Sequence, residues 1–176
     1  MKTSLTPEPL RRPRRPEMVI LFVVANQMFA IAAETVQEIR STDSLAGAAN
    51  EVVEPGFPKV RHTLERLGRT YYVVNATVHF GLPVSRPGLV LILRQQRVAV
   101  LVDRIERMTE IPSIYPLPRI FVGEERRWYR GLAYVDDLVV PIVHDSGFLT
   151  EEEFETLDTT SNLKTSQPET QGAIQA

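Results

Sequence analysis

Short apolar runs, separated by turn residues, recur along the chain from residue 19 to residue 143. They are rich in Val, Ile, Leu and Tyr and are bounded by Gly, Pro, Asn or Asp, which is typical of β-strands. The runs cover residues 19–25, 28–33, 36–39, 69–74, 89–93, 97–102, 129–135 and 138–143. Many short strands at close spacing predict an all-β sandwich or barrel, because closing a sheet removes its exposed edges.

Three connections between these runs predict hairpins. The Asn-Gln pair at 26–27 and the Asp-Asp pair at 136–137 form two-residue turns, and aspartate tolerates the positive φ that such turns require. Residues 94–96 form a three-residue hairpin loop, although without the glycine that such loops prefer. Pro141 cannot donate a backbone hydrogen bond, so its strand is expected to lie at an edge or to be bulged there.

One short helix is predicted after the last strand. Thr150, followed by Glu153, forms a capping box, and the helix is expected to run to about Leu157. Its acidic first turn suits the helix dipole. The polar composition at one end and the Pro/Arg-rich composition at the other then divide the chain into a disordered basic leader over 1–17, one domain over 18–158 and a disordered polar tail over 159–176.

The charges of the chain argue against nucleic acid as its main partner. Residues 18–149 carry 14 basic and 14 acidic side chains, whereas phosphate binding requires a surplus of Lys and Arg. The chain has no cysteine, which is compatible with a reducing compartment, so we expect a cytoplasmic protein. A secretory signal over the leader and first apolar run is the alternative, but a polar pair at 26–27 interrupts that run, which is also too short to span a membrane.

Residue types that could carry catalysis or hold a metal do not form a known motif. On a strand, His144 and Ser146 would lie about 6.6 Å apart with Asp145 on the other face, which is too far for a nucleophile and its base. Asp103 could pair with an aspartate at 136–137, but carboxylates at strand ends more often accept hydrogen bonds from turn amides. The three histidines match no metal-binding spacing. We therefore expect no catalytic residue, metal or cofactor, and a body that binds other proteins.

Four segments, in this order, resemble the CheW-like domain, which is found in the chemotaxis coupling protein and in the regulatory domain of the CheA histidine kinase. The resemblance covers residues 18–153. The segments are ANQMFAIAAETVQEIR, GRTYYVVNATVHFGLP, RVAVLVDRIERMTEIP and YRGLAYVDDLVVPIV. No single segment is specific, but the four together in order are.

The resemblance implies two intertwined five-stranded SH3-like β-barrels with short helices and a hydrophobic groove between the barrels. It also implies a non-catalytic adaptor of bacterial chemotaxis-type signal transduction. Such an adaptor couples the signalling tip of a methyl-accepting chemoreceptor to the regulatory domain of a CheA-type histidine kinase, in the cytoplasm beside membrane receptor arrays and without inserting into the membrane.

The same resemblance indicates which residues contact these partners. The matched motif positions are Val36, Glu38, Ile39, Arg66, Leu67 and Gly68. The family commonly has Asn-Leu-Arg-Gly before the strand at 69–74, whereas this chain has Glu-Arg-Leu-Gly at 65–68. The arginine is therefore displaced by one residue, and in a strand such a shift reverses the face. This departure favours a diverged adaptor with an unusual receptor or kinase.

Three alternatives remain open at this point. A coupling protein of a non-flagellar, pilus-type pathway would have the same sequence features. A β-barrel that binds nucleic acid would bind in a salt-dependent way through residues 18–149 alone, which the neutral charge of this region disfavours. A hydrolase with scattered carboxylates would require a pocket in which two of them converge.

Overall fold

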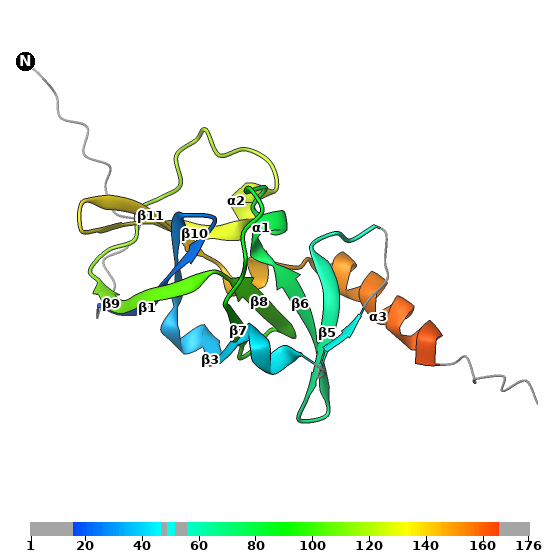
Figure 1. The fold of residues 1–176 in the computed structure, drawn as a ribbon. Helices are drawn as coiled ribbons and strands as arrows, with labels where there is room; N and C mark the ends of the chain where they lie inside the picture. Colours follow the sequence, from blue (N-terminus) through cyan, green and yellow to red (C-terminus); the bar gives the residue numbers. More distant parts are fainter. Residues whose placement is uncertain (1–15, 47–48, 52–55, 166–176) are drawn as a thin grey trace, which may run out of the picture.

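The computed structural model describes residues 16–46, 49–51 and 56–165. The predicted leader, apart from its last two residues, and the end of the predicted tail lie outside this part of the chain. Most of the regular structure is β-strand, arranged in two sheets, with three short 3-10 turns and three α-helices (Figure 1). The all-β prediction with short helices is therefore confirmed.

The first sheet combines strands from both ends of the domain. Its order is β10-β11-β2-β1-β9, with the bounds β1 Glu17–Val24, β2 Gln27–Ala32, β9 Arg104–Ile111, β10 Tyr129–Val135 and β11 Leu138–Val143. Strands β11 and β2 run parallel, and the other neighbours are antiparallel. A bridge between Tyr115 and Leu132 joins the segment after β9 to β10, so the two edges of this sheet approach each other.

The second sheet contains the middle of the chain. Its order is β3-β7-β8-β6-β5-β4, with the bounds β3 Val36–Ser41, β4 Ala49–Glu51, β5 Val60–Arg66, β6 Arg69–Asn75, β7 Leu89–Leu93 and β8 Val98–Val102. The three-residue β4 makes this a sixth strand where five were expected. Because the chain leaves the first sheet after β2 and returns at β9, the two sheets are intertwined as predicted.

Both faces of the apolar strands are buried, which explains why these runs are almost continuously hydrophobic. In β1, Val19 and Leu21 pack inside the first sheet, whereas Ile20 and Phe22 belong to a larger cluster shared with the second sheet. A third cluster, which includes Leu64 and other side chains of the second sheet, fills the inside of that sheet. The space between the sheets is therefore packed as a common core.

The hairpin between β1 and β2 differs by one residue from the prediction. Its turn consists of Ala25 and Asn26, with φ of 47° and 64°, and Gln27 already pairs with Val24. Asp103 Oδ2 accepts a hydrogen bond from the Ala25 backbone N–H at 2.7 Å. This carboxylate is therefore bonded to a turn amide, as expected. Left-handed residues at both positions match the right-handed twist of a two-residue hairpin.

Pro141 lies in β11, which is an inner strand of the first sheet rather than an edge strand. Pro141 pairs with Leu132 of β10, and the ladder to β2 contains only Ile142 and Val143. At the proline, β11 is therefore paired with β10 but not with β2. The missing N–H donor costs no ladder hydrogen bond on the side of β2.

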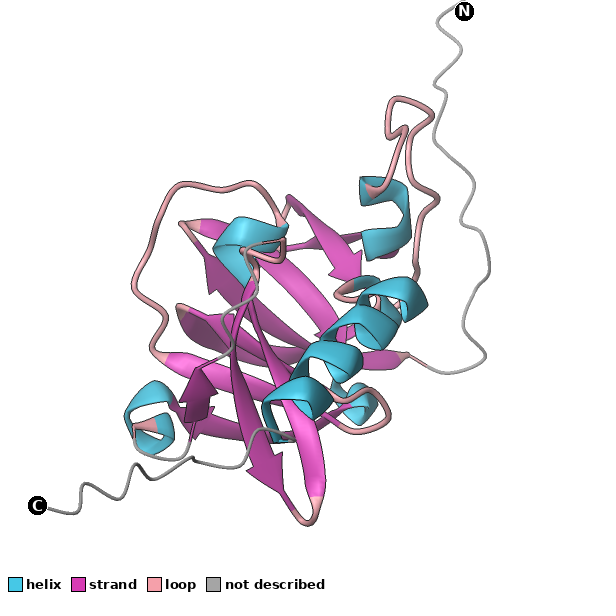
Figure 2. Cartoon of the chain, turned by 90° about the vertical axis from the view of Figure 1, so that its right-hand side faces the viewer, coloured by secondary structure: helices cyan, strands magenta, loops and turns pink. Residues whose placement is uncertain are grey.

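Helix α3 (Glu151–Thr165) is longer than predicted. The capping box is confirmed, because the Thr150 N–H donates to Glu153 Oε2 at 2.9 Å and the Glu153 N–H donates to Thr150 Oγ1 at 3.2 Å. The helix then continues past Leu157, so the beginning of the segment predicted to be a disordered tail is helical. Figure 2 shows α3 lying across the strands.

The added length of α3 is held by a charged network on the second sheet. Arg97 donates two hydrogen bonds to Asp158, at 2.9 and 2.7 Å, and the Tyr72 hydroxyl donates to the same carboxylate at 2.5 Å. The guanidinium also lies over the rings of Tyr72 and Phe154. This hydrogen-bonded Arg97 holds the pKa of Asp158 below its usual value, which keeps the carboxylate charged.

Candidate functional site

The hairpin between β5 and β6 ends in an exposed two-residue turn. Leu67 and Gly68 have φ of 49° and 70°, and the Leu67 side chain is 85% exposed. No atom lies within 4 Å of the place where a Cβ of Gly68 would be. The glycine is therefore needed for its positive φ and not for a close approach of the backbone.

Leucine is an unfavourable residue for this turn. A left-handed conformation costs an L-residue about 1–2 kcal/mol, and such two-residue turns prefer an Asn-Gly pair. Leu67 combines this backbone cost with an almost fully exposed apolar side chain. Local rules that are broken without a packing gain are typical of functional positions.

Glu38 and Arg66, expected at the partner surface, form an ion pair with each other. Glu38 belongs to β3 and Arg66 to β5, two strands that are not neighbours in the sheet order, so the pair joins opposite sides of the curled second sheet. Arg40 lies 3.6 Å from the same carboxylate. The Nε of Arg66 is buried without a hydrogen-bond partner among the described residues. These two charges therefore link β3 to β5.

The remaining candidate residues on β3 point to different environments. Val36 is buried in the core shared by the two sheets. Ile39 is 40% exposed and follows Glu38 directly, so it faces the other side of the strand. The structure thus brings Glu38, Arg66 and the Leu67–Gly68 turn to one end of the second sheet and leaves Val36 in the interior.

The segment at 144–146 is not a strand, and the distance expected from strand geometry is wrong. These residues enter a 3-10 turn over Asp145–Gly147, in which the Ser146 Oγ lies 2.8 Å from His144 Nδ1. The same nitrogen accepts the Ser146 backbone N–H at 3.2 Å and lies 3.1 Å from Asp145 Oδ1. A catalytic triad requires the serine and the carboxylate on opposite ring nitrogens, so this arrangement is a turn cap.

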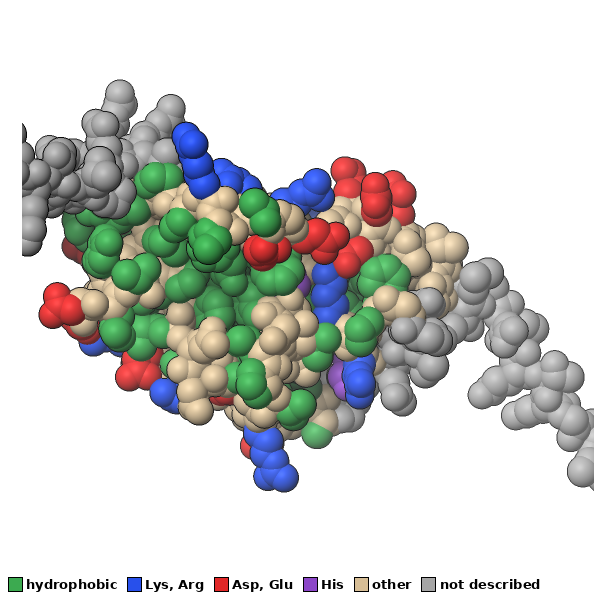
Figure 3. Space-filling model, turned by 90° about the horizontal axis from the view of Figure 1, so that it is seen from above, with side chains coloured by type: hydrophobic (Ala, Val, Ile, Leu, Met, Phe, Trp, Pro, Cys, Tyr) green, Lys and Arg blue, Asp and Glu red, His purple; other side chains and the backbone are tan. Residues whose placement is uncertain are grey.

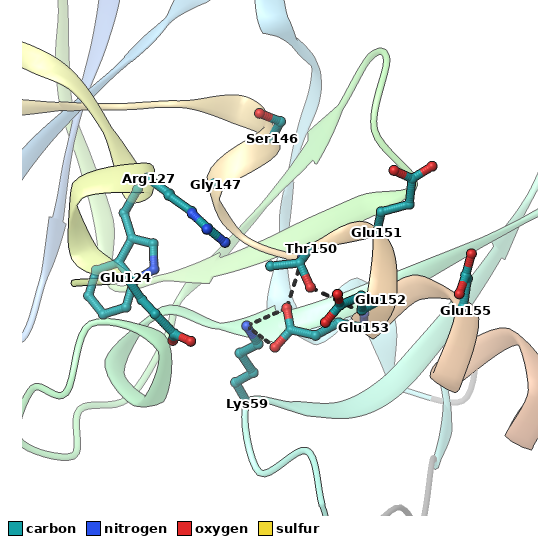
Figure 4. A pocket seen from close by; sticks show the side chains of 11 residues that line it. Lys59, Glu124, Arg127, Ser146, Gly147, Thr150, Glu151, Glu152, Glu153 and Glu155 are labelled. Atoms are coloured by element: carbon teal, nitrogen blue, oxygen red, sulfur yellow. Dashed lines mark hydrogen bonds and ion pairs between the residues drawn. The ribbon is translucent and has the colours of Figure 1, made fainter.

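A polar pocket of about 550 Å³ lies beside the start of α3 (Figure 4). Lys59 Nζ is 2.7 Å from Glu153 Oε1 inside it, and Glu153 is also the capping residue of α3. The pocket walls include Trp128 and the acidic residues at the start of the helix. Lys59 and Glu153, the charged residues at its centre, are thus already engaged in an ion pair and in the cap of α3. No group of three or more His, Asp or Glu that could hold a metal occurs in the described part of the chain.

Sequence reasoning did not single out the apolar residues at the outer side of the first sheet. An open pocket of about 520 Å³ lies there between the segment after β9 and the hairpin of β10 and β11. Its walls include Tyr115 and Tyr134, whose rings meet edge to face at 5.1 Å. Hydrophobic side chains gather over a large part of this face of the molecule, as Figure 3 shows. Strand β10 carries apolar residues on both of its faces, and this pattern is the signal that could have indicated the pocket.

Two curled sheets on a common core, with an exposed apolar turn beside a charged pair, form one β-rich module. The chain belongs to the CheW-like domain family, whose family model matches residues 18–153. This is a family of scaffolding domains of chemotaxis signalling. The described part of the chain contains no helix long and apolar enough to cross a membrane.

A solved structure supports the fold. The chain is similar to the scaffolding protein TtCheW from Thermoanaerobacter tengcongensis, with a TM-score of 0.64 and 18% sequence identity over 78% of this chain and 95% of that chain. At this identity the likeness establishes the fold alone. No curated protein sequence matches the chain.

Proposed function

We propose that this protein is a non-catalytic adaptor that couples a chemoreceptor signalling tip to the regulatory domain of a CheA-type histidine kinase. It would act in the cytoplasm beside membrane receptor arrays. Membership of the CheW-like family supports this proposal. The observation that carries it is Leu67, an exposed leucine in a backbone conformation that disfavours leucine.

The Leu67–Gly68 turn and the end of the second sheet around it form one proposed contact surface. Leu67 supplies an apolar side chain that a partner can bury, and Ile39 adds a half-exposed one. The Glu38–Arg66 pair acts through these residues, because it fixes the position of β5 and hence of the turn. Val36, the first residue of β3, contributes to the surface only by packing in the core beneath it.

The second proposed contact surface is the apolar groove between the two sheets. Because a common core fills the space between the sheets, we place the groove at the rim of this core. Phe80, Leu82 and Tyr129 are only partly buried and pack against the core there. An apolar centre with charged residues around it is the usual anatomy of a protein–protein contact.

The test is a calorimetric titration of the full chain against a receptor signalling tip and against a kinase regulatory domain. Transient array contacts should give micromolar dissociation constants. The Leu67→Asn variant should bind at least one partner about 10- to 100-fold more weakly, because burying a leucine contributes about 1.5–3 kcal/mol. Its melting temperature should not fall, since asparagine suits the left-handed turn better than leucine.

Val84→Asn is the matched control. Val84 is 98% exposed, lies outside both sheets and has no part in the proposed surfaces. This variant should bind as the unmodified chain does. Equal binding by Leu67→Asn and the unmodified chain would refute the role of the turn, and the absence of binding to both partners would refute the adaptor proposal.

A further inference from the structure

The pocket on the outer side of the first sheet has the composition of a site for an extended proline-containing peptide. Its lining combines two tyrosines, two prolines and aliphatic side chains, namely Tyr115, Pro116, Leu117, Pro118, Leu132, Tyr134 and Val139, with Arg119 and Arg126. Tyr134 and Val139 are each 53% exposed. Aromatic-lined grooves of this kind bind polyproline II segments, whose conformation is already restricted before binding.

The sequence of the leader contains such a segment. The residues before Pro16 lie outside the described structure, and they include the sequence Pro-Glu-Pro-Leu at positions 7–10. Alternating prolines favour an extended polyproline II conformation. The segment presents two prolines and a leucine to an apolar surface and carries one carboxylate, that of Glu8.

The point where the leader enters the fold is within reach of the pocket. Glu17 begins β1, pairs with Ile111 of β9 and forms an ion pair with Arg130 of β10. Paired strand residues lie about 5 Å apart and four further residues span at most ~14 Å, so Tyr115 lies within ~20 Å of Glu17. In a polyproline II conformation, the seven residues from Glu17 back to Leu10 span about 22 Å.

The charges at the rim of the pocket complement the acidic residue of this segment. Arg119 is exposed and forms no ion pair within the described residues, and Arg126 contributes only a hydrogen bond to the backbone oxygen of Phe121. The Arg119 guanidinium can accept Glu8 as a partner. The leader arginines at 11, 12, 14 and 15 lie in the sequence between this segment and Glu17, and the exposed Glu110 lies opposite Met18 at the start of β1.

We propose that residues 7–10 of the leader dock in this tyrosine- and proline-lined pocket of the same molecule. Pro7, Pro9 and Leu10 occupy its apolar lining, and Glu8 pairs with Arg119. The docked leader covers exposed apolar side chains of β10 and β11. It therefore protects one face of the first sheet while leaving the Leu67–Gly68 turn of the second sheet free for a partner.

The absence of cysteine in the chain makes a direct test possible. In the full-length protein, Thr6→Cys provides a single attachment point for a nitroxide spin label. Paramagnetic broadening of backbone amide signals is then measured against the reduced label. Docking predicts strong broadening at Leu132, Tyr134 and Val139.

Two variants and a control make the test specific. Arg119→Glu and Tyr134→Ser each change an exposed lining residue and should release the leader, so the broadening at Leu132 and Val139 should be lost. Adding Glu8→Lys to Arg119→Glu restores an opposite-charge pair and should restore the broadening. Arg61→Glu reverses an exposed arginine on β5 of the second sheet and should leave the broadening unchanged.

Two results would overturn the proposal. One is broadening that falls off smoothly around Glu17 and is the same in all variants, which would mean an undocked leader. The other is broadening that appears in a mixture of isotope-labelled chains without spin label and spin-labelled chains without isotope. That result would mean that the leader docks on a second copy.

Discussion

Acidification should destabilise the fold through one buried histidine, His79, at the end of α1 (Ala76–His79). Its ring packs against Phe80 at 4.9 Å, Trp128 at 4.6 Å and Phe148 at 5.3 Å. Its Nε2 is buried without a hydrogen-bond partner among the described residues. This burial, together with the positive charge of Lys59, lowers the pKa of His79 from 6.5 to about 3.

The sign of the effect follows from the lowered pKa. The unfolded chain binds a proton at this histidine below pH 6.5, whereas the folded chain does so only near pH 3. Stability therefore falls as the pH drops through this window, because protons favour the unfolded state. At pH 5 the loss amounts to about 2 kcal/mol, since each pH unit below the unfolded pKa costs about 1.4 kcal/mol.

The measurement is the free energy of unfolding in urea at pH 7 and at pH 5, for the unmodified chain and for His79→Leu. Leucine has a similar volume and cannot titrate, so this variant should lose about 2 kcal/mol less than the unmodified chain between the two pH values. If His79→Leu and the unmodified chain lose the same amount, His79 is not held neutral by its surroundings.

The contribution of the charged network at α3 to the free energy of unfolding should also be measurable. Asp158→Ala removes the acceptor of the Tyr72 hydroxyl and the ion-pair partner of Arg97. Because water screens the partly exposed ion pair, we expect the free energy of unfolding in urea to fall by about 1–2 kcal/mol. A loss below about 0.3 kcal/mol would show that α3 is held by apolar packing alone. Glu38→Lys should lower stability by about 1–3 kcal/mol, because it leaves Arg66 partly buried beside a like charge. Adding Arg66→Glu should recover most of this loss, and a double variant no more stable than Glu38→Lys would contradict the pairing.

Most of the strands that sequence patterns predicted are buried on both faces, whereas the predicted β3 has a single buried residue, Val36. The run at 89–93, for example, is β7 with the same bounds, and four of its five residues are buried. Strands β5 and β9 were not predicted, because their charged residues dilute the apolar signal. In β9, Ile111 is the single fully buried residue, so the strand is recognised only by its pairing with β1. Hydrophobic pattern thus indicates burial rather than strand pairing.

Candidate site residues were harder to assign, because the partners of a charge are set by tertiary structure. The family resemblance placed Glu38 and Arg66 at a partner surface, in keeping with the rule that charged side chains are rarely buried unpaired. The structure satisfies the same rule differently, by pairing the two across strands that are distant in the sheet order. No periodicity along either strand could indicate this contact.

Under the proposed function, stability and partner binding make opposite demands on Arg66 and Leu67 at the end of the β5–β6 hairpin. Arg66 anchors the hairpin to Glu38, and its replacement would change the fold and the contact surface together. Leu67, the next residue, contributes almost no buried area and imposes a backbone cost. A substitution there separates the two roles, because asparagine relieves the backbone while removing the apolar side chain. Weaker binding together with unchanged or higher stability is the combination that only a residue kept for a partner can produce.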